Sequence, residues 1–194
     1  MELAPFLGAF ALIVLAELGD KTMITVIALS SKHSQKLVFS ASLLALSLVS
    51  VVGVLIGKVL YGLAPAAWIS IVAGILFLVF GLATLLRAEK EEAENGRIDA
   101  LGAFGGIFAL MAIMEMGDKT QLSIIALSAQ YGAVIEVLIG AVAAFALVTF
   151  VGVFLGREIG KRVAEKYVRY GSALVFVAFG LLFLIQGALG LDLL

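Results

Sequence analysis

Glu17-Leu-Gly-Asp-Lys-Thr22 places three charged residues inside an apolar run that is long enough to cross a lipid bilayer. The pattern returns as Glu115-Met-Gly-Asp-Lys-Thr120, 98 positions later (115 minus 17), and nine of the fourteen residues at 17–30 are identical to their counterparts at 115–128. A charged side chain at the bilayer centre costs at least ~2.5 to 3.5 kcal/mol, so it is retained where it pairs, faces water or holds an ion. The duplicated motif therefore predicts a functional site.

The composition of the chain is that of an integral membrane protein. Of its 194 residues, 63% are hydrophobic and 14% are charged, with a mean hydropathy of +1.19. The net charge of −1 and the absence of basic-aromatic patterns exclude nucleic acid as an expected partner. No cysteine is present for disulfides or thiolate metal sites, and no Ser-His, Cys-His or nucleotide-loop pattern indicates an enzyme.

Six apolar stretches are long enough to span the bilayer as helices, in which backbone groups bond within their own segment. Lys and Arg near helix ends are retained on the cytoplasmic side. Ten of the thirteen basic residues fall on one side of the predicted arrangement and only Lys58 on the other, so both termini are expected outside the cytoplasm. The predicted spans run roughly 4–29, 37–63, 68–86, 100–127, 133–155 and 168–189.

The internal repeat extends past the motif. At an offset of 99 positions, Gly53-x-x-x-Gly57 matches Gly152-x-x-x-Gly156, and Phe77-x-x-Phe80-Gly81 matches Phe176-x-x-Phe179-Gly180. We therefore expect a single all-α transmembrane domain over 1–194, with three-helix repeats at 1–87 and 100–194 and a charged cytoplasmic linker at 88–99. Three crossings per repeat invert the topology of the second half. Inverted repeats are typical of secondary transporters, whose sites lie near the midplane where the repeats meet.

The acids of the motif are the candidate metal ligands. On a continuous helix, the Glu, the Asp three positions later and the Lys four positions later share one face. Four acids against two lysines leave a formal charge of −2, which one divalent cation would neutralise, and oxygen ligands favour Ca²⁺, Mn²⁺ or Mg²⁺. The candidate ligands are Glu17, Asp20, Glu115 and Asp118. Further candidates for the cation site or its gating are Lys21, Thr22, Thr25, Lys119, Thr120, Gln121 and Ser123.

Several features of the motif leave alternatives open. Gly19 and Gly117 permit either a break in the helix, whose freed carbonyls could face an ion, or close contact between helices. Each lysine either fills the empty site as a surrogate cation or pairs with an acid and shapes the site. A lattice of Glu with the Lys four positions later would hold the halves together without binding an ion, but four acids exceed what such packing needs. The neighbouring methionines, Met23, Met114 and Met116, are expected to pack rather than bind metal.

Two copies of Glu-x-Gly-Asp-Lys-Thr in a chain of this length closely resemble the signature of the Gdt family of membrane proteins, which is related to the lysine exporter superfamily. The resemblance covers nearly the whole chain. It implies transport of Mn²⁺ and Ca²⁺ out of the cytosol in exchange for protons, with the cation held by the four motif acids. The lack of the longer N-terminal and central segments of eukaryotic members suggests a prokaryotic plasma-membrane protein.

The resulting expectation is a cation antiporter without a resident cofactor, in which the acids bind the divalent ion when deprotonated and release it as protons arrive. Its expected partners are the divalent ion, the proton and the lipid bilayer. The sequence is compatible with either a monomer or a homo-oligomer. The alternatives are an exporter of cationic amino acids, a cation channel, and a purely structural membrane subunit.

Overall fold

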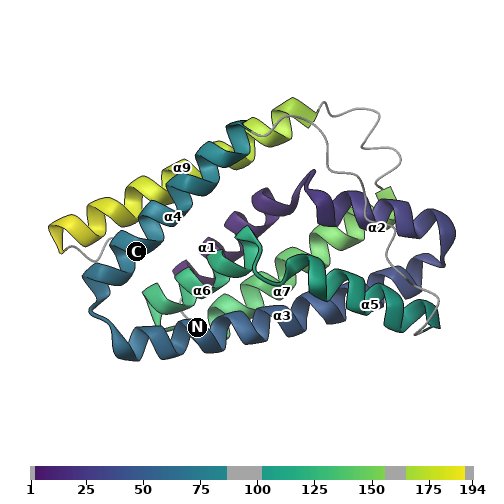
Figure 1. The fold of residues 1–194 in the computed structure, drawn as a ribbon, viewed down its shortest axis with the longest axis horizontal. Helices are drawn as coiled ribbons and strands as arrows, with labels where there is room; N and C mark the ends of the chain where they lie inside the picture. Colours follow the sequence, from purple (N-terminus) through teal and green to yellow (C-terminus); the bar gives the residue numbers. More distant parts are fainter. Residues whose placement is uncertain (1–2, 87–101, 156–164, 191–194) are drawn as a thin grey trace.

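The computed structural model describes residues 3–86, 102–155 and 165–190, and the regular structure in these ranges is helical throughout (Figure 1). The all-α prediction is confirmed for these residues. The elements are α1 (Leu3–Glu17), α2 (Lys21–Lys32), α3 (Gln35–Leu63), α4 (Ala66–Leu86), α5 (Gly102–Glu115), α6 (Lys119–Tyr131), α7 (Val134–Phe150), the π-helix η2 (Val151–Leu155) and α9 (Glu165–Leu189).

Three helices of the described chain are long and apolar enough to cross a membrane, namely α3, α4 and α7 with its π-helical continuation. A fourth candidate span consists of α1 and α2, two helices that are bent by 64° at a short break. Shorter apolar helices are α5 and the Ala173–Leu189 part of α9. The protein is therefore a multi-pass membrane protein, and its elements recur in the same order in both halves of the chain.

The apolar stretches predicted at 4–29 and 100–127 are each broken inside the motif, which is one of the two alternatives that Gly19 and Gly117 left open. In the first half α1 ends at Glu17 and α2 begins at Lys21, and the second half breaks at the same motif positions. Gly19 has φ 72° and Gly117 has φ 80°, a left-handed conformation that glycine adopts at no steric cost. No atom lies within 4 Å of a Cβ built on Gly117, so close helix contact does not explain this glycine. The Glu and Asp of a motif consequently do not share one helix face.

The repeated phenylalanines pack α4 against α9, which lie side by side along one edge of the molecule (Figure 1). The ring centroid of Phe77 lies 6.0 Å from that of Phe176 and 5.6 Å from that of Phe183. A Cβ on Gly180 would lie 2.9 Å from the backbone nitrogen of Leu78, so only glycine permits this approach. The corresponding helices of the two halves thus form one tightly packed pair.

The repeated small residues of α3 and η2 set the positions of the motif helices. Gly53 and Gly57 of α3 face α6, and a Cβ on Gly57 would lie 2.6 Å from the carbonyl oxygen of Ile125. In the second half, a Cβ on Gly152 would lie 2.6 Å from Cγ2 of Val26 in α2. The prediction that these glycines serve close packing is confirmed, and each motif helix after the break packs on a helix of the opposite half.

Several sequence predictions fall outside the described residues. They concern the charged linker at 88–99, Gly156, and most of the basic residues between 156 and 167 that determine the predicted topology.

Candidate functional site

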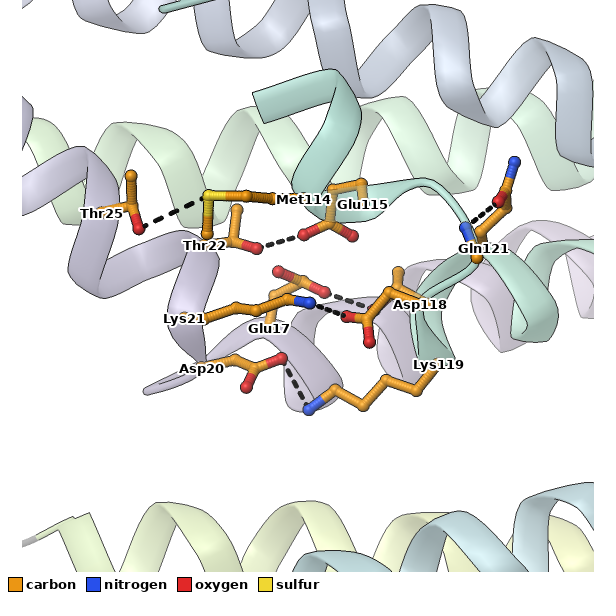
Figure 2. Close-up of polar contacts among 12 residues, drawn as sticks. Glu17, Asp20, Lys21, Thr22, Thr25, Met114, Glu115, Asp118, Lys119 and Gln121 are labelled. Atoms are coloured by element: carbon orange, nitrogen blue, oxygen red, sulfur yellow. Dashed lines mark hydrogen bonds and ion pairs between the residues drawn. The ribbon is translucent and has the colours of Figure 1, made fainter. Parts of the chain in front are cut away.

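The two helix breaks lie next to each other in the interior, and their charged side chains point toward one another (Figure 2). Each Glu is the last residue of a helix, Glu17 in α1 and Glu115 in α5. Each Asp is the N-cap of the following helix, Asp20 before α2 and Asp118 before α6. An N-cap Asp usually accepts a hydrogen bond from a backbone N–H of the first turn, but neither side chain makes a capping hydrogen bond here. Both carboxylates are turned to other partners.

The threonine of each motif bonds to the glutamate of the other motif. The hydroxyl of Thr22 donates to Oε1 of Glu115, and the hydroxyl of Thr120 donates to Oε1 of Glu17. All four side chains are buried, and the exposed fraction is 0% for Glu17 and 1% for Glu115. These crossed hydrogen bonds bring the acids of the two halves into one site.

The lysine of each motif forms an ion pair with the aspartate of the other motif. Nζ of Lys119 lies 2.7 Å from Oδ2 of Asp20, and Nζ of Lys21 lies 3.4 Å from Oδ2 of Asp118 (Figure 2). The lysine partners are thus the aspartates across the repeat interface, and not the glutamates four positions earlier in the same motif. These ion pairs are compatible with both alternatives for the lysines, and the described contacts are not those of a lattice of Glu and Lys within each motif.

One oxygen of each buried glutamate has no hydrogen-bond donor. Oε2 of Glu17 and Oε2 of Glu115 are inaccessible to solvent and have no hydrogen-bond partner. A buried polar atom is normally satisfied because its desolvation is otherwise uncompensated. These two oxygens are therefore chemically available to a proton or a cation.

The site as seen here holds ammonium groups rather than a preformed metal cage. In the described ranges, no three Asp, Glu or His side chains gather closely enough to hold a metal ion. Lys21 and Lys119 form ion pairs with the two aspartates. The assignment of the four acids as ligands stays a prediction, and a divalent ion would have to rearrange these contacts.

Three of the predicted neutral side chains bond elsewhere and do not reach the motif acids. Thr25 donates to the sulfur of Met114 at 3.9 Å, and Ser123 donates to the carbonyl oxygen of Lys119 at 2.7 Å. The side-chain oxygen of Gln121 accepts from the backbone N–H of Gly117 at 2.5 Å.

Met23 occupies the position in the first repeat that Gln121 occupies in the second, and it also accepts a hydrogen bond from the glycine of its own motif. Its sulfur accepts from the backbone N–H of Gly19 at 3.4 Å. Gln121 and Met23 therefore support the two breaks.

Sequence reasoning missed the crossed character of these contacts and one polar pair away from the motif. The hydroxyl of Ser70 in α4 donates to Oε1 of Gln130 in α6 at 2.7 Å, and both side chains are buried. The available signal was the presence of Ser70 and Gln130 in otherwise apolar stretches. Their mutual distance was not predictable, because it depends on how α4 packs on α6.

On the predicted assignment of the motif acids as ligands, replacing Thr120 by Val should weaken binding of a divalent cation about tenfold or more, because a hydrogen bond to a charged acceptor contributes about 1.5 to 3 kcal/mol. The variant has a similar shape but leaves Glu17 without its donor. Thr120→Ser should retain wild-type affinity. Thr84→Val is the matched control, since Thr84 donates to Phe80 of its own helix. Isothermal titration would measure the affinities. Equal affinities of Thr120→Val and Thr84→Val would show that the hydrogen bond from Thr120 to Glu17 does not contribute to cation binding.

The model of a family described as divalent cation/proton antiporter GDT1 matches the chain twice, at residues 5–92 and 103–190. GDT1-like protein 5 of Oryza sativa subsp. japonica is 26% identical over 97% of this chain and 97% of its own length. Divalent cation/proton antiporter GDT1 of Saccharomyces cerevisiae is 26% identical over 95% of this chain and 85% of its own length.

The chloroplastic GDT1-like protein 1 of Oryza sativa subsp. japonica is 29% identical over 93% of this chain, which spans 62% of that relative's length. No solved structure matches the chain. Each family match covers one half of the chain and contains one charged motif at one helix break. The chain therefore belongs to the divalent cation/proton antiporter GDT1 family.

Proposed function

We propose that this chain is a secondary transporter that exports divalent cations, Mn²⁺ or Ca²⁺ or both, from the cytosol in exchange for protons. The observation that carries the proposal is the crossed site, in which the acids of two family-matched repeats meet in the interior. The name of the yeast relative describes an antiport of divalent cations and protons. The cation and the proton are the transported partners, and the bilayer surrounds the protein.

The proposed ligands are Glu17, Asp20, Glu115 and Asp118. Carboxylate oxygens suit hard divalent cations, and no cysteine exists in the chain to favour a softer metal. A carboxyl group that is protonated loses its charge and its value as a ligand, so protons and the cation compete for the same oxygens. This competition would couple the release of the ion to the arrival of protons, and two carboxyl protons balance the charge of one divalent ion.

The proposed architecture is a single transmembrane domain at 1–194, with six spans in two inverted repeats at 1–87 and 100–194 joined by a cytoplasmic linker at 88–99. Its support is the recurrence of a broken first helix in each half. Broken helices whose ends meet at a midplane site are a recurring feature of secondary transporters built from inverted repeats. We place the protein in the plasma membrane with both termini outside the cytoplasm, on the basis of the distribution of Lys and Arg.

The packing of the α4–α9 pair supports alternating access. In the described chain this pair packs against α1 and α6 and has no comparable contact with α2 or α5. In the proposed topology, α1 and α6 are the outer halves of the broken spans. The contact of Ser70 with Gln130 would then help to close the site to the outer side. Movement of the α4–α9 pair away from α1 and α6 would open the site to the outer side and close it to the inner side.

The exchange is tested by reconstituting the protein in lipid vesicles and following Mn²⁺ and internal pH together. We expect a gradient of about one pH unit to raise Mn²⁺ accumulation about tenfold for each proton exchanged, with protons moving in the opposite direction. Uptake that ignores the pH gradient and causes no pH change would contradict the antiporter. Uptake of L-lysine in place of Mn²⁺ would identify an amino acid exporter, and large electrical currents would identify a channel.

A further inference from the structure

We propose that Lys21 and Lys119 are tethered competing cations that occupy the site in the metal-free protein and must leave when the divalent ion binds. The inference rests on the proposed function and extends it by giving the lysines a place in the transport cycle. The lysines are therefore positioning residues, which hold the motif acids in place while no metal ion is bound. They are not metal ligands, since an ammonium group has no lone pair.

The geometry of the ion pairs supports exchange rather than permanent attachment. Each ammonium group reaches across the repeat interface to an Asp that is the N-cap of a helix but makes no capping hydrogen bond. The lysine thus replaces the usual partner of the N-cap carboxylate. When the lysine leaves, the Asp is free to bind an ion.

The accessibility of the lysines differs from that of the glutamates. The side chains of Lys21 and Lys119 retain 27% and 13% of their exposed surface, whereas Glu17 and Glu115 are fully buried. Each lysine therefore already lies at the border of the site, and its flexible stem allows its charge to withdraw without dismantling the core. The glutamates, held by the threonines of the opposite repeat, stay in place.

Charge makes the two occupants mutually exclusive. With both lysines in place, the ammonium groups neutralise Asp20 and Asp118, and a divalent ion between the acids would be close to two further positive charges. In a region of low dielectric constant such repulsion is strong. The ion therefore binds only as the lysines withdraw, and after its release their return neutralises the aspartates while the empty transporter reorients.

Lysine reactivity in the wild-type protein provides the first test. Purified protein is acetylated with and without saturating Mn²⁺, and the modification of Lys21, Lys119 and Lys58 is quantified by mass spectrometry. Bound Mn²⁺ should raise the modification rate of both motif lysines about tenfold or more, since an ion pair protects the amine. Lys58, an exposed residue of α3, should not change. Unchanged motif lysines in protein that demonstrably binds Mn²⁺ would overturn the inference while leaving the proposed function intact, whereas absence of binding of both Mn²⁺ and Ca²⁺ would contradict the proposed function itself.

Substitution of the lysines provides the second test. Removal of the competitor in Lys21→Met or Lys119→Met should tighten Mn²⁺ binding at least about tenfold, while transport in vesicles slows because the empty acids lack their counter-charge. Lys58→Met should alter neither quantity. A purely structural ion pair would instead give weaker Mn²⁺ binding together with a lower melting temperature, and this result in both variants would overturn the inference.

Discussion

Replacing Glu17 or Glu115 by Gln should lower Mn²⁺ transport at least about a hundredfold, because loss of one charged partner in a buried site costs about 3 to 5 kcal/mol and each 1.4 kcal/mol is tenfold. The amide keeps an oxygen that can still accept the hydrogen bond from the threonine of the other repeat. What it loses is the negative charge and the ability to exchange a proton for the cation. Uptake of Mn²⁺ into vesicles measures the effect.

The matched control for this pair is Glu136→Gln, which removes an acid from the first turn of α7 outside the motif. This variant should transport at the wild-type rate. Circular dichroism and gel filtration of all three variants would establish that they fold. If Glu17→Gln and Glu115→Gln both transport like the control, these residues are not in the site.

The double variant Gly19→Ala, Gly117→Ala should reduce transport by about thirtyfold or more, because a left-handed conformation costs a residue with a Cβ roughly 1 to 2 kcal/mol at each position. Both glycines have positive φ angles at the breaks. A Cβ on Gly117 meets no neighbouring atom, so steric crowding cannot produce the loss there. The effect must come through the backbone, which relieves the strain by extending the helix and turning Asp and Lys away from the opposite motif.

Gly190→Ala separates this local effect from general strain. Like Gly117, Gly190 has a positive φ (64°) and open space around its Cβ position. Unlike Gly117, it follows α9 and lies far from both motifs in the sequence. The control should show about half the decrease in thermal stability that the double variant shows, because one position is strained instead of two, without loss of Mn²⁺ uptake. Equal transport by the double variant and the control would show that the breaks are dispensable.

The sequence was sufficient to predict the helical class and the internal repeat, whereas the assignment of the motif residues to a cation site stays a prediction. Apolar stretches of span length indicated the helices, and the identity of the two motifs indicated that both halves contribute equivalent acids. These predictions succeeded because they depend on composition and spacing, which a single chain displays directly.

The sequence was not sufficient to predict which motif residues touch. Glycine is compatible with both a break and close helix packing, so the sequence left both alternatives open at Gly19 and Gly117. A continuous helix would place Lys21 beside Glu17, whereas the broken helix sends Lys21 to Asp118. The crossed partners follow from the packing of the two halves, a long-range property that local spacing does not encode.

The stoichiometry of Mn²⁺ binding tests the shared site most directly. Isothermal titration of the purified protein should give one Mn²⁺ per chain, and Glu17→Gln alone or Glu115→Gln alone should each remove that single binding event, because both halves supply ligands to one ion. Two independent ions per chain, with each single substitution removing one and leaving the other, would contradict a site shared between the repeats.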